Sequence, residues 1–224
     1  MTRLAFLTIG QSPRGDLSGV VERELPPGVT VSHLGALDGL GASGLAECAS
    51  RPDEPWLISK LADGTVITLD ADVIGARLQI CIDRLEEQGT DIIVLLCTGE
   101  FPGLSTSRAT IIEPDAVVCK TAQGLLGDRL AGIILPLPEQ VGEARGKWAI
   151  LGRPPIFSFA SPYESLTDPL IAAATELQAG GAQALILDCM GYALWHKQAL
   201  RAAGITLPVL VSGQVLAAAL AAFM

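Results

Sequence analysis

The sequence predicts an α/β protein made of two similar halves, each a parallel, Rossmann-like sheet covered by helices. Two observations lead to this prediction. Short runs that are apolar on both faces alternate with segments of helical period, as expected for parallel strands that are buried on both sides. In addition, an internal repeat relates two stretches of the chain that lie about half its length apart.

The predicted strands are short runs rich in β-branched and other apolar residues, at 4–9, 29–34, 65–69, 91–96, 130–136, 154–159, 183–188 and 207–211. Two segments between them, 70–88 and 165–179, have the period of helices, and a terminal helix is expected over 212–223. Because strands and helices alternate along the chain, parallel pairing of the strands is expected.

The repeat aligns residues 85–97 with residues 177–189 without a gap, and each stretch ends on a cysteine at the close of a strand. A looser repeat relates 4–13 to 130–140, each an apolar strand followed by a turn that contains Gly or Pro. These shifts predict a duplicated architecture, with an active-site cleft between the two halves.

The duplication gives a division of the chain. Residues 1–118 together with 205–224 are assigned to the first half, and residues 119–204 to the second. The terminal strand and helix can complete either half, and this division places them with the first.

Composition limits the classes of function. The chain has 224 residues, of which 50% are hydrophobic and 17% charged, as in folded proteins. Its formal net charge of −9, without any Lys/Arg cluster, argues against a nucleic-acid partner. The apolar tail VLAAALAAFM is too short for a membrane span. Five cysteines and no recognisable export signal favour reduced thiols in the cytoplasm, and a homo-oligomer is left open.

Cys97 and Cys189 close the two matched strands, and ligands of parallel α/β sheets bind at the carboxyl ends of strands. Backbone N–H groups and the start of a following helix can lower the pKa of such a thiol from about 8.5. Two opposed thiols can remove a proton from one face of a carbon and return one to the other face, without a cofactor. Burial of both cysteines as small hydrophobes is the alternative.

Other motifs indicate structure rather than chemistry. Cys48, Cys81 and Cys119 have no match in the repeat and are interpreted as inert. The stretch 39–44 fits G-x-G-x-x-G but does not directly close a strand, so it is interpreted as a flexible loop. The two histidines lack ligand spacing and C-x-x-C is absent, so no metal site is expected. His196 is expected on a solvated helix face.

Arg14 follows the first strand by a few residues, and its planar guanidinium can grip a carboxylate with two parallel hydrogen bonds. A solvated cation is the alternative interpretation of this residue. Arg108, in the turn after Cys97, is a weaker candidate for the same role.

Several short motifs resemble a known family. The CTG at 97–99 and the CMG at 189–191, each ending a strand in a duplicated α/β chain, resemble the aspartate/glutamate/hydantoin racemase superfamily. Within it, LTIGQSPR at 7–14, HLGALDGL at 33–40 and LDCMGY at 187–192 resemble the AroM family. The resemblance covers nearly the whole chain.

The resemblance implies the fold of the Asp/Glu racemases, with Cys97 and Cys189 as the acid/base pair and no cofactor. The implied substrate-binding residues follow the first strand and the two cysteines: Gln11, Ser12, Arg14, Thr98, Gly99, Met190 and Gly191. The implied substrate is a small carboxylic or amino acid. Many of these racemases have Cys-Asn-Thr at the first site, whereas this chain has Cys-Thr-Gly and no asparagine, so the substrate is left open.

Three hypotheses about function follow. The leading one is a cofactor-independent racemase or isomerase that uses both cysteines. The second is a decarboxylase or cis-trans isomerase of a dicarboxylate that uses one cysteine. The third is a non-catalytic protein that binds a small molecule and uses its cysteines only for packing, which unreactive thiols would reveal.

Overall fold

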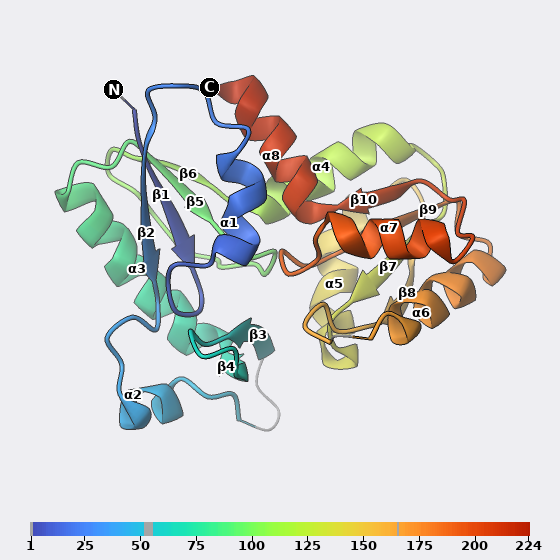
Figure 1. Cartoon of the computed structure of the whole chain (residues 1–224), viewed down its shortest axis with the longest axis horizontal. Coiled ribbons are helices and arrows are strands. Elements are labelled where there is room, and N and C mark those ends of the chain that lie inside the picture. The colour runs from blue at the N-terminus through green and yellow to red at the C-terminus, as the bar shows by residue number, and fades with distance from the viewer. Residues whose placement is uncertain (1, 52–55, 165) are drawn as a thin grey trace. The chain divides into compact units, whose positions relative to one another are not determined.

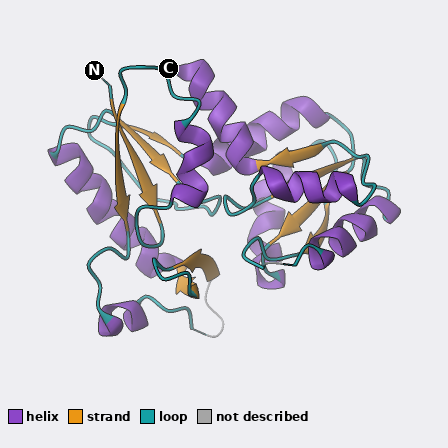
Figure 2. Ribbon diagram, viewed as in Figure 1, coloured by secondary structure: helices purple, strands orange, loops and turns teal. Residues whose placement is uncertain are grey.

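A computed structural model describes residues 2–51, 56–164 and 166–224 of the chain. It divides into two compact units, Met1–Pro114 with Met224, and Asp115–Phe223. Each unit contains one four-stranded parallel sheet with flanking helices, drawn in Figure 1 and Figure 2. The predicted α/β class with two parallel-sheet halves is therefore confirmed.

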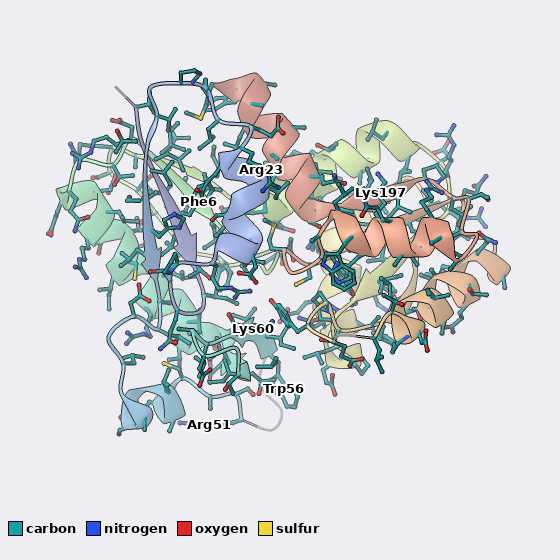
Figure 3. The ribbon with its side chains drawn as sticks, viewed as in Figure 1. Phe6, Arg23, Arg51, Trp56, Lys60 and Lys197 are labelled. Atoms are coloured by element: carbon teal, nitrogen blue, oxygen red, sulfur yellow. The ribbon has the colours of Figure 1, made fainter. Side chains whose placement is uncertain are left out.

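The first unit is built on a sheet with the strand order β2-β1-β5-β6. Its strands are β1 (Arg3–Thr8), β2 (Thr30–Gly35), β5 (Ile92–Leu95) and β6 (Thr110–Ile112). Its helices are α1 (Gly15–Glu22), α2 (Ala42–Glu47) and α3 (Ala71–Glu87). β1 is central, and Phe6, labelled in Figure 3, stacks on His33 of β2 with their ring centroids 5.6 Å apart.

The second unit has the strand order β10-β9-β7-β8. Its strands are β7 (Ala131–Leu135), β8 (Ile156–Phe159), β9 (Ala184–Leu187) and β10 (Val209–Val211). Its helices are α4 (Pro114–Leu126), α5 (Val141–Lys147), α6 (Asp168–Ala179), α7 (Leu194–Ala202) and α8 (Ser212–Phe223), with short 3₁₀ turns at η1 (Pro138–Gln140) and η2 (Trp148–Ile150). Residue 165, the first of the predicted helical range 165–179, lies outside the described residues.

Alternation along β9 gives the second unit a core on each face of its sheet. Leu185 and Leu187 pack with residues of α6 and α7 on one face. Ile186 packs on the other face, with Trp148 and residues of α4. Successive side chains of a strand point to opposite faces, so the one buried run supplies both cores.

The repeat found in the sequence is a repeat of structure. α3 is followed by Gly89, which has a φ of +78°, and the next amide N–H, that of Thr90, donates to the carbonyl of Leu85 at 3.0 Å. α6 leads to Gly181, which has a φ of +89°, and the next N–H donates to the carbonyl of Leu177, also at 3.0 Å. This glycine-dependent helix end sends the chain into β5 in one unit and into β9 in the other.

One predicted strand has a different role from the one expected. Residues 65–69 lie largely in β4 (Val66–Asp70), which pairs antiparallel with β3 (Trp56–Lys60) in a separate two-stranded sheet. The connecting Asp63-Gly64 turn, with a φ of +90° at Gly64, suits a hairpin. β3 was not predicted, because its sequence WLISK is short, ends on two polar residues and lacks the apolar–polar alternation of a half-buried strand.

The division of the chain also differs from the one drawn from sequence. β10 pairs in parallel with β9, so residues 205–223 group with the second unit and not with the first. The boundary lies between Pro114 and Asp115, at the start of α4, rather than after residue 118. In the described part of the chain, none of the helices combines the length and apolar character needed to cross a bilayer.

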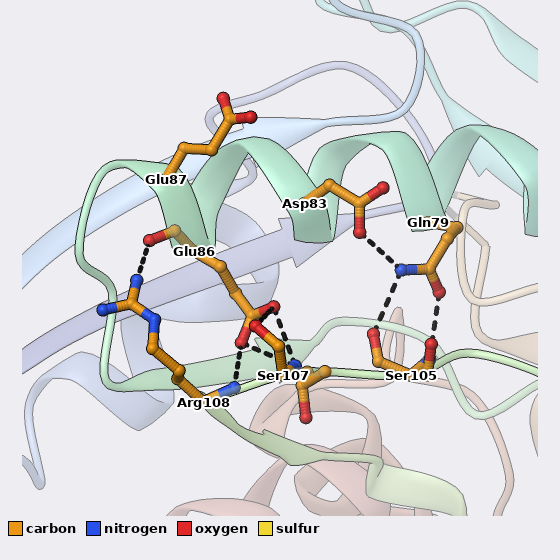
Figure 4. A pocket seen from close by; sticks show the side chains of 8 residues that line it. Gln79, Asp83, Glu86, Glu87, Ser105, Ser107 and Arg108 are labelled. Carbon is orange, nitrogen blue, oxygen red and sulfur yellow. Dashed lines mark hydrogen bonds between the residues drawn. The ribbon is translucent and has the colours of Figure 1, made fainter.

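Glu86 at the end of α3 fixes the loop that follows Cys97 (Figure 4). Its carboxylate accepts hydrogen bonds from the backbone N–H of Ser107, at 2.9 and 3.0 Å, of Arg108 at 2.6 Å and of Ala109 at 2.7 Å. The Arg108 guanidinium donates to the backbone carbonyl of the same glutamate. Arg108 therefore holds its own loop in this structure instead of an incoming carboxylate.

The Glu86 carboxylate should make stability depend on pH. Backbone N–H groups of Ala109, Ser107 and Arg108 lower its pKa from 4.5 to about 2. A carboxyl with a lowered pKa in the folded state contributes stability above its unfolded pKa, and this contribution is lost as pH falls from about 4.5 towards 2. We expect Glu86→Gln to lower the melting temperature at pH 7 and to flatten its acid dependence.

Thermal unfolding between pH 7 and pH 2.5 checks this expectation. Glu87→Gln is the matched control, because Glu87 neighbours Glu86 and makes none of the hydrogen bonds drawn in Figure 4. Equal acid dependence of the wild type and Glu86→Gln would contradict the assignment.

Candidate active site

The first candidate half-site is the turn Cys97-Thr98-Gly99 after β5. The thiol of Cys97 is half-buried, and its Sγ accepts a hydrogen bond from the backbone N–H of Gly99 at 3.3 Å. A side chain at Gly99 would be tightly packed, because its Cβ would lie 3.0 Å from Cδ2 of Leu57 and 3.4 Å from the sulfur. Thr98, the residue between Cys97 and Gly99, is buried.

The second candidate half-site is the turn Cys189-Met190-Gly191 after β9. Cys189 is likewise half-buried, and its Sγ accepts a hydrogen bond from the N–H of Gly191 at 3.4 Å. A Cβ on Gly191 would lie 2.9 Å from Cγ of Pro162 and 3.0 Å from the ring of Tyr163. Met190 is buried, so in this structure it offers a ligand little of its side chain.

The two turns therefore share a hydrogen bond to the cysteine sulfur that the sequence repeat did not reveal. In each, the N–H of a glycine two residues after the cysteine points at the sulfur. A donor so placed stabilises the thiolate, which is the form that acts as a base or nucleophile. Glycine also avoids a close contact in each turn, with Leu57 at Gly99 and with Pro162 and Tyr163 at Gly191.

The expected help from helix N-termini differs between the turns. No helix begins directly after Cys97, since residues 98–109 form an irregular loop that leads to β6. α7 begins at Leu194, five residues after Cys189. The glycine N–H groups, rather than a helix dipole common to both turns, are the donors that the two cysteines share.

The loop after β1 is held by a carboxylate that the sequence analysis missed. Asp38 accepts hydrogen bonds from the backbone N–H of Ser12 at 2.7 Å, from its hydroxyl at 2.5 Å and from the N–H of Gly35 at 2.8 Å. It thereby joins the GQSPR and HLGALD motifs. The Ser12 hydroxyl is engaged with Asp38, whereas Gln11 accepts from the N–H of Ala62 at 2.8 Å.

Arg14 is buried, which excludes the solvated-cation interpretation. Its Nε and Nη2 each donate to the carboxylate of Asp16 at 2.8 Å, and its Nη1 donates to the Ser59 hydroxyl at 3.3 Å. Partial burial acts to raise the pKa of Asp16, but hydrogen bonding and charge from Arg14 outweigh it and lower that pKa. In this structure the Arg14 fork therefore holds Asp16, and its binding of a substrate carboxylate stays a prediction.

The hairpin connects the parts of this first half-site. Ser59 of β3 touches Arg14, and a Cβ on Gly10 would lie 2.4 Å from its hydroxyl oxygen. Leu57 of the same strand packs at Gly99. The structure therefore brings the loop after β1 and the Cys97 turn to one hairpin. The signal in the sequence that could have indicated this hairpin is the Asp63-Gly64 turn before the apolar run at 65–69.

His196 is buried, not solvated as predicted. Its Nδ1 accepts the backbone N–H of Ala193 at 2.9 Å, and its ring stacks on Trp195 with the centroids 3.5 Å apart. Burial lowers the pKa of His196 to about 4, so the ring is neutral near pH 7. Its role here is to order the first turn of α7.

The three other cysteines are poorly suited to act as bases. Burial raises the pKa of Cys48 and of Cys81, and it raises that of Cys119 to about 12. Within the described residues, no group of three or more His, Cys, Asp or Glu side chains is placed to hold a metal ion.

Close packing at Gly191 predicts that this position cannot accept a side chain. We expect Gly191→Ala to lower the free energy of unfolding by about 1–3 kcal/mol, because Pro162 and Tyr163 would have to shift. Gly124→Ala in α4 is the matched control. It adds a methyl group in open space within a helix and should raise stability by about 0.5–1 kcal/mol.

Urea denaturation of the two variants measures both effects. Equal stability of Gly191→Ala and the wild type would show that the CMG turn is looser than the structure describes.

The fold has relatives among solved structures. Allantoin racemase from Klebsiella pneumoniae matches with a TM-score of 0.66 and 13% identity, over 100% of this chain and 87% of its own. Glutamate racemase from Aquifex pyrophilus matches with a TM-score of 0.61 and 16% identity, over 100% and 84%. Maleate isomerase from Pseudomonas putida matches with a TM-score of 0.60 and 12% identity, over 99% and 92%.

Sequence comparison gives the family directly. No curated protein matches the sequence. The family model described as AroM protein matches residues 4–224, almost the whole chain. The chain therefore belongs to the AroM family, and it has the fold of the Asp/Glu racemase superfamily.

Proposed function

We propose that this protein is a cofactor-independent racemase or isomerase of a small carboxylic or amino acid, with Cys97 and Cys189 as its acid/base pair. One observation carries the proposal. Both thiols close equivalent strands of a duplicated fold, and both sulfurs accept an N–H from the glycine two residues later. Cys48, Cys81 and Cys119 do not share this arrangement.

The proposed reaction is a transfer of protons. One cysteine, as thiolate, takes the hydrogen from the α-carbon; the C–H bond breaks, an S–H bond forms, and the electron pair is delocalised onto the substrate carboxylate. The other cysteine, as thiol, gives its proton to the opposite face of the same carbon. Its own S–H bond breaks, so the two cysteines end the turnover with exchanged protonation states. The proposal requires one carbon to lie within reach of both sulfurs.

The relatives support this kind of chemistry. Of the three structures described above, two are named as racemases and one as an isomerase, and arylmalonate decarboxylase also matches, with a TM-score of 0.60 and 15% identity. A single-cysteine isomerase or decarboxylase is the alternative that the experiment must separate. Because reduced thiols are required, we place the protein in the cytoplasm.

Binding of the substrate carboxylate is proposed at the ends of the strands. The amide groups of the two turns after the cysteines are the proposed donors, together with the Gln11 side-chain amide and the Arg14 guanidinium. Ser12, whose N–H and hydroxyl donate to Asp38, is proposed to position this loop at the substrate. A substrate carboxylate would compete with Asp16 for the Arg14 fork, and Asp16 is exposed enough to be displaced.

Screening amino, hydroxy and dicarboxylic acids for exchange of the α-hydrogen in deuterated water identifies the substrate. With an active acid, Cys97→Ser and Cys189→Ser should each abolish racemisation, because a serine hydroxyl is too weak an acid to share the proton-transfer role. Each variant should still exchange the α-hydrogen of one enantiomer with solvent, and the two variants should prefer opposite enantiomers. NMR of both enantiomers measures this.

Cys81→Ser is the control and should keep full activity. If only one of the two cysteines is required, the single-cysteine alternative is favoured. If neither is required, the proposed chemistry is wrong, and thiols that resist alkylation would favour a non-catalytic binding protein.

Arg14 gives a second test of the same site. Arg14→Lys keeps the charge but loses the two-bond grip, and we expect weaker binding of the active acid by about 1.5–3 kcal/mol. Isothermal titration calorimetry measures the affinity, with Arg23→Lys on the exposed end of α1 as the control. Unchanged affinity in Arg14→Lys would assign Arg14 to holding Asp16 alone.

A further inference from the structure

A cluster of buried charges lies directly beside the second turn in sequence. Asp188, the residue before Cys189, accepts a hydrogen bond from Nζ of Lys147 at 2.7 Å on one carboxylate oxygen. Its other oxygen accepts from Nε1 of Trp148, also at 2.7 Å. Lys147 Nζ lies 3.3 Å from a carboxylate oxygen of Asp115.

The side chains of Asp188, Lys147 and Trp148 are buried. Asp188 is 4% exposed, and Trp148 is fully buried. Burial alone would lower the pKa of Lys147, but the carboxylates of Asp188 and Asp115 outweigh it and raise that pKa, so Lys147 stays charged. Removing one partner of a buried ion pair leaves the other charge uncompensated, which is strongly destabilising. The cluster therefore holds Asp188 firmly in place.

The side chains of Asp188 and Cys189 lie on opposite faces of the sheet and are connected through the backbone of β9. Residues of a strand point alternately to the two faces of the sheet. The Asp188 side chain lies with Trp148 on the face that also buries Ile186. Cys189 packs on the opposite face, with the cluster that contains Leu187. The charged side chains thus lie on the face of the sheet opposite the Cys189 thiol.

The first half achieves the same turn without charges. In the aligned repeat, Leu96 stands where Asp188 stands, and it is buried. Both residues make the same backbone contact with the central strand, Leu96 N–H to the carbonyl of Leu7 at 2.7 Å and Asp188 N–H to that of Ile134 at 3.0 Å. An apolar residue therefore satisfies the fold at this position, and the charged cluster is an addition in the second half.

We propose that Asp188 is a positioning residue for Cys189: its carboxylate, anchored by Lys147 and Trp148, fixes the end of β9 so that the N–H of Gly191 stays directed at the Cys189 sulfur. The inference rests on the proposed function only in treating Cys189 as a catalytic thiol. The hydrogen bonds of Asp188 to Lys147 and Trp148 thereby restrict the movement of the second turn, from the face of the sheet opposite the thiol.

The test compares the reactivity of two thiols in one molecule. Iodoacetamide alkylation of Cys97 and Cys189 is followed at pH 7.5 by peptide mass spectrometry on the full chain, with Cys97 as internal reference. In Asp188→Asn we expect the Cys189/Cys97 rate ratio to fall about tenfold, because a displaced Gly191 N–H no longer stabilises the thiolate. Asp115→Asn is the matched control, since it also leaves Lys147 with one carboxylate but does not adjoin Cys189.

Both substitutions should lower the melting temperature, but only Asp188→Asn should change the rate ratio. An unchanged ratio in Asp188→Asn, or an equal change in Asp115→Asn, would reduce Asp188 to a structural role and overturn the proposal. If Asp188→Asn fails to fold, Asp188→Glu decides. It keeps the charge but displaces the carboxylate by one methylene, so the ratio should again fall, and an unchanged ratio overturns the proposal.

The outcome is independent of whether the proposed reaction is found, since alkylation needs no substrate. Once an active acid is known, Asp188→Asn should slow α-hydrogen exchange mainly for the enantiomer that Cys97→Ser still exchanges. Equal slowing of both enantiomers would contradict positioning of one thiol. A protein with no racemase activity and an altered alkylation ratio would reject the proposed function but keep the role of Asp188.

Discussion

Burial of the central strands is the constraint on which the other features depend. β1 and β5 in one unit, and β7 and β9 in the other, are covered on both faces, so their side chains are almost entirely apolar. Polar chemistry is then confined to the residues that follow each strand. Cys97 and Cys189 occupy this place, and the glycine two residues later supplies an N–H donor at a position where a side chain would be crowded.

The two halves share the turn but not the means of holding it. The Cys97 turn is followed by a loop that Glu86 ties down through backbone N–H groups, and the residue before the thiol is an apolar Leu96. The Cys189 turn is backed by the ion pair of Asp188 and Lys147. The two halves have the same N–H contact to the sulfur, and each stabilises its turn with different interactions.

Local patterns predicted what depends on local sequence. The buried runs gave most of the parallel strands, and the ungapped repeat identified the two cysteines, because helix end, glycine and strand follow one another within thirteen residues. Asp38 and Asp188 were missed because their partners are 26 and 41 residues away in sequence. The hairpin was misplaced because its pairing is antiparallel and separate from the sheet.

The β3–β4 hairpin contacts both parts of the first half-site, the loop after β1 and the Cys97 turn, which the sequence did not indicate. Ser59 contacts Arg14, and two residues earlier on the same strand Leu57 packs against Gly99. In a strand, side chains two residues apart lie on the same face, so one face of β3 meets both the loop after β1 and the Cys97 turn. A displacement of this hairpin must therefore alter the Arg14 guanidinium and the N–H donor of the Cys97 thiol together. If the proposed function holds, binding of a carboxylate by Arg14 and the basicity of Cys97 would be coupled within this unit.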